Sequence, residues 1–123
     1  MSYILLVEDN EMNRDMLMRR LRRRGFEVDT AADGAQAIDQ VEARPPELIL
    51  MDLSLPVMDG WEATRRLKAS PATADIPVVA LTAHALKEDE KKAFAAGCDA
   101  FETKPVNLGR LISTILELLQ KSA

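Results

Sequence analysis

Residues 48–60, LILMDLSLPVMDG, show the pattern on which the whole chain is built. Leu48–Met51 is a continuously apolar run, which is typical of a strand buried on both faces of a parallel sheet, and it ends at Asp52. The proline and the Asp-Gly pair that follow predict a loop over residues 53–60. Residues 61–69 then show helical periodicity. The segment therefore predicts a strand, a loop and a helix, with an acidic side chain where the strand ends.

The same unit recurs along the rest of the chain. The expected strands are residues 3–7, 26–31, 48–52, 78–82 and 100–103, and the expected helices are residues 11–24, 35–43, 61–69, 86–96 and 108–119. Asn10 is placed to cap the first helix, and Gly25 and Gly97 are placed to end the first and fourth helices in a left-handed conformation. The pair Asp33-Gly34 is predicted to turn the chain between the second strand and its helix.

The strict alternation of apolar strands with helices predicts one architecture. It is a doubly wound α/β fold, flavodoxin-like, in which a five-stranded parallel sheet of order 2-1-3-4-5 carries helices on both faces. The five units occupy residues 1–123, so we expect a single domain with no output domain. The strand order reverses between strands one and three, and a site is expected at their carboxyl ends.

Composition narrows the class of protein. The 123 residues are 47% hydrophobic, which is enough for one core, and their net charge of -4 disfavours binding to nucleic acid or to anionic membranes. No apolar run approaches the roughly 18 residues of a membrane span. Cys98 has no partner for an internal disulfide, which fits a reducing compartment and a small buried side chain without chemistry. We expect a cytoplasmic protein.

Five polar side chains are predicted to converge, because parallel strands bring their carboxyl ends to one edge of the sheet. Glu8 and Asp9 follow the first strand, Asp52 ends the third, Thr82 ends the fourth and Lys104 follows the fifth. At about 5 Å and an effective dielectric constant near 20, each carboxylate pair repels by about 3 kcal/mol, so a cation is expected. Oxygen ligands favour a hard ion, with Mg²⁺ preferred to Ca²⁺. In this setting Asp52 is suited to attack phosphorus and form an acyl phosphate.

These residues resemble the motifs of one family, the receiver domain of two-component response regulators. The motifs are Glu8-Asp9, Asp52 followed by Pro56 and Gly60, Thr82-Ala83, and Lys104-Pro105. The resemblance spans essentially the whole chain and implies that a phosphohistidine of a sensor histidine kinase or histidine phosphotransfer protein phosphorylates Asp52. It further implies that phosphorylation changes a surface formed by the fourth strand, the fourth helix, the fifth strand and the fifth helix. This surface would bind a downstream target protein.

The resemblance also implies the roles of individual residues. Mg²⁺, or Mn²⁺ in its place, would contact Asp9, Asp52 and the backbone carbonyl of Ser54, with Glu8 acting less directly. Glu8 stands where the family more often has Asp, and it is one methylene longer.

The implied switch pairs Thr82, which moves towards the phosphoryl group, with Phe101, which turns inward. Phe101 replaces the more usual tyrosine, and core packing is the other reading of its role. The Lys104-Pro105 bond is expected to be cis. Ser54 and His84 are candidates for tuning the phosphoryl lifetime, although His84 also fits an ordinary surface loop.

Several alternatives stay open. A haloacid-dehalogenase-type phosphatase uses similar groups, but it has a second Asp two residues after the nucleophile, where this chain has Ser54. A flavodoxin-like cofactor carrier needs a phosphate-binding loop after the first strand, and none is present. The arginines within residues 19–24 fit a solvated face and a kinase-docking surface equally well. We expect a monomer, with phosphorylation-linked dimerisation open, and either a DivK-like single-domain regulator or a receiver cut from a hybrid kinase.

Overall fold

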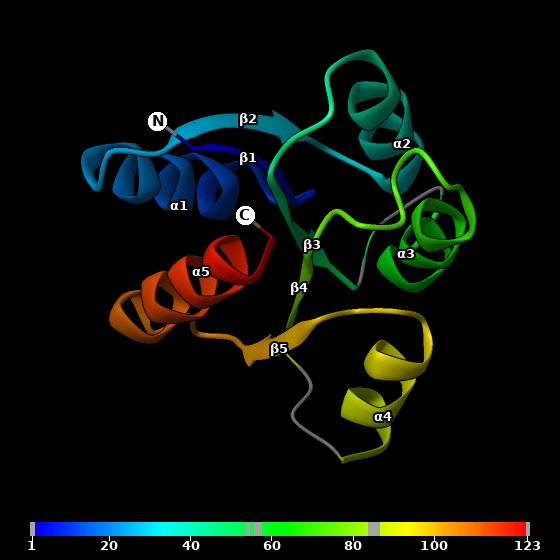
Figure 1. Ribbon diagram of the computed structural model, residues 1–123. Coiled ribbons are helices and arrows are strands. Elements are labelled where there is room, and N and C mark those ends of the chain that lie inside the picture. The colour runs from blue at the N-terminus through cyan, green and yellow to red at the C-terminus, as the bar shows by residue number, and fades with distance from the viewer. Residues whose placement is uncertain (1, 54, 56–57, 84–86, 123) are drawn as a thin grey trace.

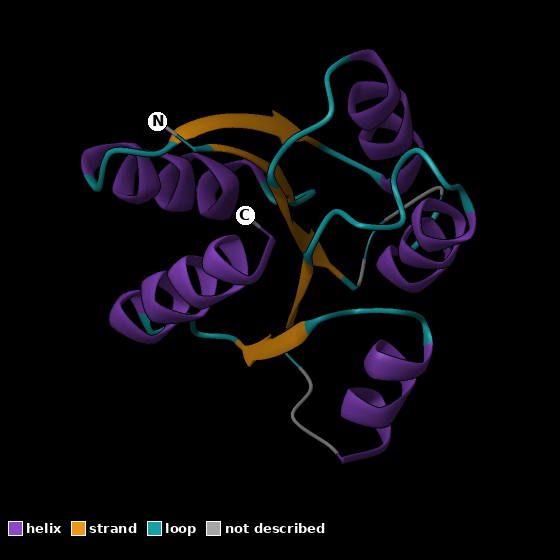
Figure 2. Cartoon of the chain, viewed as in Figure 1, coloured by secondary structure: helices purple, strands orange, loops and turns teal. Residues whose placement is uncertain are grey.

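A computed structural model of the chain describes residues 2–53, 55, 58–83 and 87–122. Strands and helices alternate along it (Figure 1, Figure 2). Their order is β1 (Tyr3–Val7), α1 (Glu11–Arg23), β2 (Glu27–Ala31), α2 (Gly34–Ala43), β3 (Leu48–Asp52), α3 (Gly60–Ala69), β4 (Val78–Thr82), α4 (Lys87–Ala95), β5 (Ala100–Thr103) and α5 (Leu108–Ser122).

The five strands form one parallel sheet in the order β2-β1-β3-β4-β5. This confirms the predicted doubly wound α/β fold and its strand order. The register aligns Val7 of β1 with Met51 of β3, and Asp52 of β3 with Leu81 of β4. The carboxyl ends of the central strands therefore lie side by side at one edge.

The two faces of the sheet carry separate apolar cores, because alternate strand residues point to opposite faces. On one face Leu6 and Leu50 pack with residues of α1 and α5. On the other face Leu5 and Ile49 pack with residues of α2, α3 and α4. Figure 1 shows the same division, with α1 and α5 on one side of the strands and the other three helices opposite. The three central strands, β1, β3 and β4, are buried along their whole length, as their largely apolar sequences predict, whereas the edge strands β2 and β5 are buried only in part.

Aspartate or asparagine side chains start the first three helices. The side chain of Asn10 accepts a hydrogen bond from the backbone N–H three residues later, and Asp33 and Asp59 do the same. Gly34 and Gly60 are thus the first residues of α2 and α3 and not parts of preceding turns, which corrects the predicted starts of both helices by one residue. The physical reason is that the preceding Asp satisfies an N–H group that the first helical turn leaves without a partner.

Other boundaries differ slightly from the prediction. Gly25 and Gly97 have φ values of +93° and +107°, which confirms the two left-handed positions. Phe26 lies outside β2, because its N–H donates to the Leu21 carbonyl at the end of α1 and the pairing with β1 begins one residue later. Helix α5 continues to Ser122. Residue 86, predicted to start the fourth helix, lies outside the described residues.

The amino ends of β4 and β5 are tied together at the edge of the sheet opposite the predicted site. The Lys68 ammonium donates to the carbonyl oxygens of Ala74 and Ile76 at 3.1 and 2.8 Å and to Asp99 Oδ2 at 3.0 Å. Asp99 Oδ2 also accepts the N–H of Val78 at 2.8 Å. These bonds fix where the two strands begin.

Within the described part of the chain, no helix combines the length and the apolar character that crossing a membrane requires.

Candidate functional site

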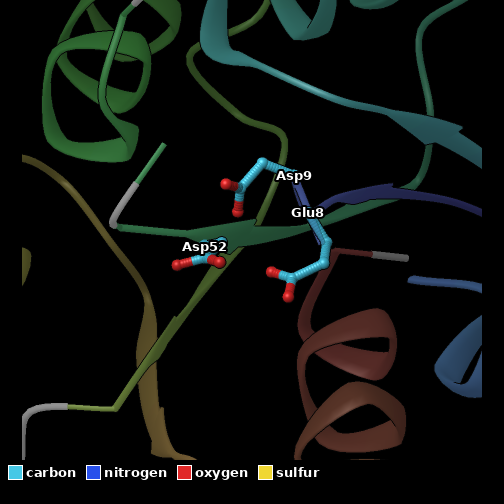
Figure 3. Close-up of side chains that lie close together, drawn as sticks. All are labelled: Glu8, Asp9 and Asp52. Atoms are coloured by element: carbon cyan, nitrogen blue, oxygen red, sulfur yellow. The ribbon is translucent and has the colours of Figure 1, made fainter. Parts of the chain in front are cut away.

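The three predicted carboxylates meet at the carboxyl ends of β1 and β3 (Figure 3). One oxygen atom from each of Glu8, Asp9 and Asp52 lies within 4.8 Å of the other two. Glu8 and Asp52 are both 4% exposed, whereas Asp9 is exposed to solvent. The cluster therefore has two buried members and one that faces the outside, an arrangement that the sequence spacing alone does not show.

Lys104 bridges the buried pair. Its ammonium donates to Glu8 Oε1 and Oε2 at 3.1 and 3.0 Å and to Asp52 Oδ2 at 2.9 Å. The Lys104-Pro105 peptide bond is cis, as the family resemblance implies. Burying a carboxylate is costly unless it is paired and hydrogen-bonded. One ammonium thus gives both acids a hydrogen-bonded partner, although its single charge offsets only one of the two carboxylates.

The burial of the pair changes how readily its members ionise. Burial raises the pKa of Glu8 to about 7, and a hydrogen bond with Asp52 adds to the rise while Lys104 opposes it. Burial acts to lower the pKa of Lys104, but the hydrogen bonds and negative charges of Asp52 and Glu8 outweigh it and the pKa of Lys104 is raised. The lysine therefore stays protonated at neutral pH, and the acidic pair is short of positive charge.

Both backbone groups of Glu8, its N–H and its carbonyl, form hydrogen bonds where the chain leaves β1. The N–H of Glu8 donates to the Ala31 carbonyl at the end of β2, at 3.0 Å. The guanidinium of Arg14, on the first turns of α1, donates to the Glu8 carbonyl at 3.3 Å. The sequence analysis did not identify Arg14, because a backbone contact from a helical arginine leaves no recognisable spacing. These two bonds fix the direction in which Glu8 and Asp9 leave β1.

The backbone after Asp52 is anchored to its neighbours on both sides. The N–H of Leu53 donates to the carbonyl of Leu81 on β4 at 3.0 Å, and the N–H of Gly60 donates to the carbonyl of Leu53 at 3.3 Å. The start of α3 therefore lies directly against the end of β3. This places the chain that returns from the loop close to the proposed phosphoacceptor.

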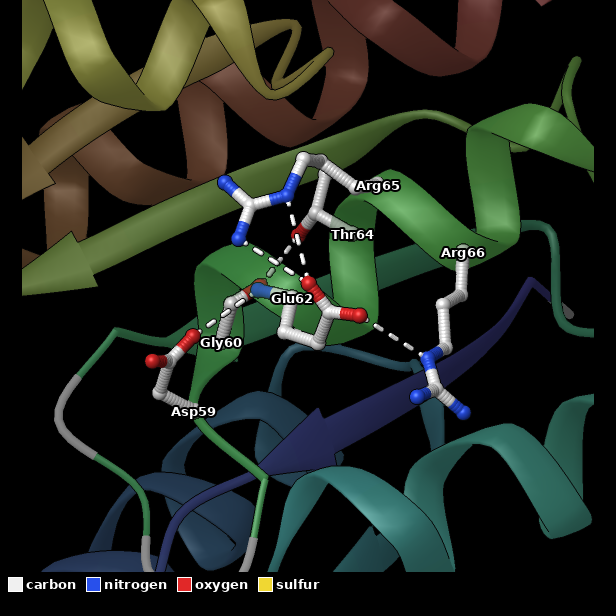
Figure 4. A network of polar contacts seen from close by, with 6 residues as sticks. All are labelled: Asp59, Gly60, Glu62, Thr64, Arg65 and Arg66. Carbon is white, nitrogen blue, oxygen red and sulfur yellow. Dashed lines mark hydrogen bonds and ion pairs between the residues drawn. The ribbon is translucent and has the colours of Figure 1, made fainter.

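Side chains of α3 support that helix start (Figure 4). Asp59 Oδ1 accepts the N–H of Glu62 at 2.8 Å, and the Thr64 hydroxyl donates to the Gly60 carbonyl at 2.7 Å. The carboxylate of Glu62 forms ion pairs with Arg65 and Arg66, both at 3.0 Å. Since Glu62 and its two partners are well exposed, the ion pairs contribute little stability, and the cap and the buried hydroxyl matter more.

The remaining predicted residues divide into two groups. Thr82 is 2% exposed at the end of β4, next to Thr103 of β5. Phe101 is half-buried on β5 and packs against the core on the α2, α3 and α4 face. Ser54 and His84, the candidates for tuning, lie outside the described residues.

The donor set fits a hard divalent cation. Three carboxylates lie close enough to share an ion, and the exposed Asp9 gives access from solvent. Carboxylate oxygen atoms, with the rest of the coordination filled by water, are the ligands that Mg²⁺ prefers. All three carboxylates are therefore candidate ligands, and Lys104 contacts two of them, Glu8 and Asp52.

Comparison with known proteins gives a consistent result. The family model of the response regulator receiver domain matches residues 4–116. The polar-differentiation response regulator DivK of Brucella anthropi is 38% identical over 116 residues, which cover 94% of this chain and 94% of that protein.

Solved structures agree with the sequence relatives. The receiver domain of the sensor histidine kinase PA1611 from Pseudomonas aeruginosa, solved with a magnesium ion in its active site cleft, is 37% identical. It superposes with a TM-score of 0.90 over 97% of this chain and 98% of that one. The signal receiver domain of a histidine kinase from Syntrophus aciditrophicus is 31% identical, with a TM-score of 0.92 over 98% of this chain and 92% of that chain.

The fold and the acidic edge of the sheet thus define a class of signalling domain. The chain belongs to the response regulator receiver domain family of two-component systems. Receiver domains interact with sensor histidine kinases and with downstream targets.

Proposed function

We propose that the chain is a phosphorylation switch in which Asp52 accepts a phosphoryl group from a phosphohistidine of a sensor histidine kinase or histidine phosphotransfer protein. The single observation that supports this most is the position of Asp52. It is the buried carboxylate at the end of the central strand, flanked by two further acids and contacted by Lys104 at 2.9 Å. In this proposal the protein accepts the donor's phosphoryl group on Asp52 and does not act as a hydrolase that turns over substrate.

The transfer is a displacement at phosphorus. A carboxylate oxygen of Asp52 forms the new O–P bond while the P–N bond of the donor breaks, and the donor's imidazole leaves with the electron pair and takes a proton. The developing charge lies on the equatorial phosphoryl oxygens, so catalysis depends mainly on alignment and on positive groups around them. The ammonium of Lys104 is the protein's own positive group for this purpose.

A divalent cation completes the charge balance. We assign Mg²⁺ or Mn²⁺ to Asp9 and Asp52, with the Ser54 carbonyl as a further proposed ligand and Glu8 acting through Lys104 or water. When bound, the ion offsets the negative charge of the acids and of the incoming phosphoryl group. The magnesium ion in the homologous PA1611 receiver domain supports this assignment.

The output is a change of surface on the β4-α4-β5-α5 side. In the proposal the Thr82 hydroxyl hydrogen-bonds a phosphoryl oxygen, and Phe101 moves further inward as Thr82 leaves its present position. Helix α4 is suited to move, because among its described residues only Ala93 is fully buried. A downstream protein would read the altered surface.

The decisive experiment is labelling with acetyl phosphate and Mg²⁺. The wild-type chain should gain one hydroxylamine-labile phosphate, and Asp52→Asn should gain none. Asp75→Asn, which changes an exposed carboxylate in the connection before β4, is the matched control and should label normally. Full labelling of Asp52→Asn would refute the assignment. Release of many phosphates per chain, without a stable adduct, would instead indicate a phosphatase.

A further inference from the structure

A pocket of about 450 Å³ lies between α1 and α5, on the face of the sheet that these helices cover. Its floor is formed by Leu6 of β1 and Leu81 of β4. Its walls are largely apolar and half-buried, and they come from Leu17 of α1, from Val106 in the loop before α5 and from Leu108 at the start of α5. Leu6 and Leu81 are already buried, so a ligand gains chiefly by removing the partly exposed apolar walls from water. The volume is within the range of small-molecule sites, roughly 300–1,000 Å³.

Two cationic side chains line the pocket. Arg20 of α1 is exposed and marks its outer end, whereas Lys104 is partly buried beside Glu8, which also lines the pocket, and marks its inner end. A second hollow of about 330 Å³ shares Met16 and Arg20 with the pocket and is lined further by Met12, Asp15, Arg19 and Arg23. The part of α1 beside the pocket thus carries three arginines against one acid, although the chain as a whole has a net charge of -4.

We propose that this pocket binds a small amphiphilic anion, a ligand with an unbranched or ring-shaped apolar body and one acidic head group. The apolar body occupies the space above Leu6 and Leu81, and the head group pairs with the Arg20 guanidinium. The lysine at the inner end is already bound by Glu8 and Asp52, so it offers the head group less than the arginine does. Charge complementarity therefore orients the ligand with its acid outward.

The pocket and the acidic site share two residues, Glu8 and Lys104. A ligand that fills the inner end confines the Lys104 side chain to its bridge between Glu8 and Asp52. Held there, the ammonium is less able to move from Asp52 Oδ2 to an oxygen of the incoming phosphoryl group. Ligand binding is therefore expected to slow phosphorylation, a consequence that rests on the proposed function of Asp52.

The binding step is tested with octanoate and its neutral analogue 1-octanol, added to ¹⁵N-labelled protein and followed by NMR. Both should give saturable shifts confined to α1, the start of α5 and the ends of β1 and β4. Arg20→Gln should weaken octanoate binding about tenfold, the value of one charge-assisted hydrogen bond, and leave octanol binding unchanged. Arg24→Gln removes the same charge from the same helix end outside both hollows and is the matched control.

A second variant tests the cavity itself. Val106→Trp places a large side chain into the pocket from a loop position, and it should abolish the binding of both probes while its melting curve shows a folded protein. Equal octanoate affinity in the wild type and Arg20→Gln, or shifts scattered over the surface, would overturn the proposal. The proposal would also be overturned if a phosphotransfer protein shifted the resonances of the pocket residues while octanoate and octanol did not. The pocket would then be part of a protein-docking surface.

The regulatory consequence is read separately, as the rate of labelling by acetyl phosphate with and without saturating octanoate. We expect labelling to slow several-fold in the wild type and to be unaffected in Val106→Trp. A wild-type chain that binds octanoate but never labels would refute the function of Asp52 and leave the pocket established. A chain that labels at the same rate with the pocket filled would refute only the coupling.

Discussion

Gly60 lies so close to Asp52 that a Cβ atom on the glycine would overlap the backbone carbonyl oxygen of Asp52 and come within 2.8 Å of Leu53 Cα. The first residue of α3 is thereby packed against the residue proposed to carry the phosphoryl group. The contact is between backbone atoms, so no side-chain rotation can relieve it. The absence of a side chain at position 60 is therefore a condition for the geometry of the site.

Gly60→Ala is expected to lower the free energy of unfolding by about 2 kcal/mol or more, because the backbone of either β3 or α3 must shift. It should also impair labelling of Asp52. Gly109→Ala is the matched control, since its Cβ would meet only Asn107 Oδ1 at 3.5 Å on an exposed part of α5. That change should stabilise the chain by about 0.5–1 kcal/mol. Urea denaturation of both variants checks the prediction, and similar values for the two would contradict it.

Lys104→Met is expected to leave Glu8 and Asp52 buried without their shared ammonium. The side chain of Lys104 is 24% exposed and those of its partners 5%. We expect a loss of about 1–3 kcal/mol in metal-free buffer, the typical penalty when a buried polar group loses one hydrogen-bonding partner. Mg²⁺ should restore part of the loss, so its effect on Tm should be larger in this variant than in the wild type.

The control for that comparison is Lys87→Met, which removes an exposed lysine at the start of α4. It should change neither the stability in chelator nor the response to Mg²⁺. Equal Mg²⁺ responses in wild type and Lys104→Met would show that the ammonium and the metal do not act on the same charges.

Asp9→Asn tests the metal site through stability. Millimolar Mg²⁺ should raise the Tm of the wild type, since a ligand at ten times its Kd stabilises the folded state by about 1.4 kcal/mol. The increase should largely disappear in Asp9→Asn, because the exposed member of the carboxylate cluster is lost. Asp39→Asn, an exposed change on α2, should retain the full increase. Differential scanning fluorimetry with and without chelator measures the effect, and an unchanged response in Asp9→Asn would place the ion elsewhere.

Cys98 is expected to be almost inert in the folded protein. Its thiol is 5% exposed, and burial raises its pKa to about 11. At pH 8 the native thiolate fraction is therefore about a thousandth, and disulfide reagents should react at least about 100-fold more slowly than in denaturant. Because the folded pKa lies above the unfolded value, this group's contribution to stability is complete below about pH 9 and declines as pH rises towards 11. A fast reaction at pH 8 would show that Cys98 is accessible.

The element pattern was predictable from the sequence because it depends on local and periodic features. Unbroken apolar runs such as Leu48–Met51 are buried wherever they pair, and the N-cap Asn10 and the left-handed glycines act within a few residues of themselves. The prediction failed by single residues at Gly34 and Gly60, where an Asp-Gly pair fits both a turn and a capped helix start. Only the hydrogen bond from the Asp side chain distinguishes the two.

The candidate site was predictable in composition but not in detail. The order of the strands and the polar residues at the carboxyl ends of four of them determine that Glu8, Asp9, Asp52, Thr82 and Lys104 share an edge. The sequence by itself therefore determined the fold, the family and the membership of the acidic edge. Tertiary structure alone decided that Lys104 bridges the buried Glu8 and Asp52, that Arg14 and Gly60 hold the backbone around them, and that a pocket adjoins them between α1 and α5. These features depend on contacts between residues far apart in the sequence, such as the 3.1 Å hydrogen bond between Lys104 and Glu8, which are 96 positions apart, and no local pattern in the sequence encodes such contacts.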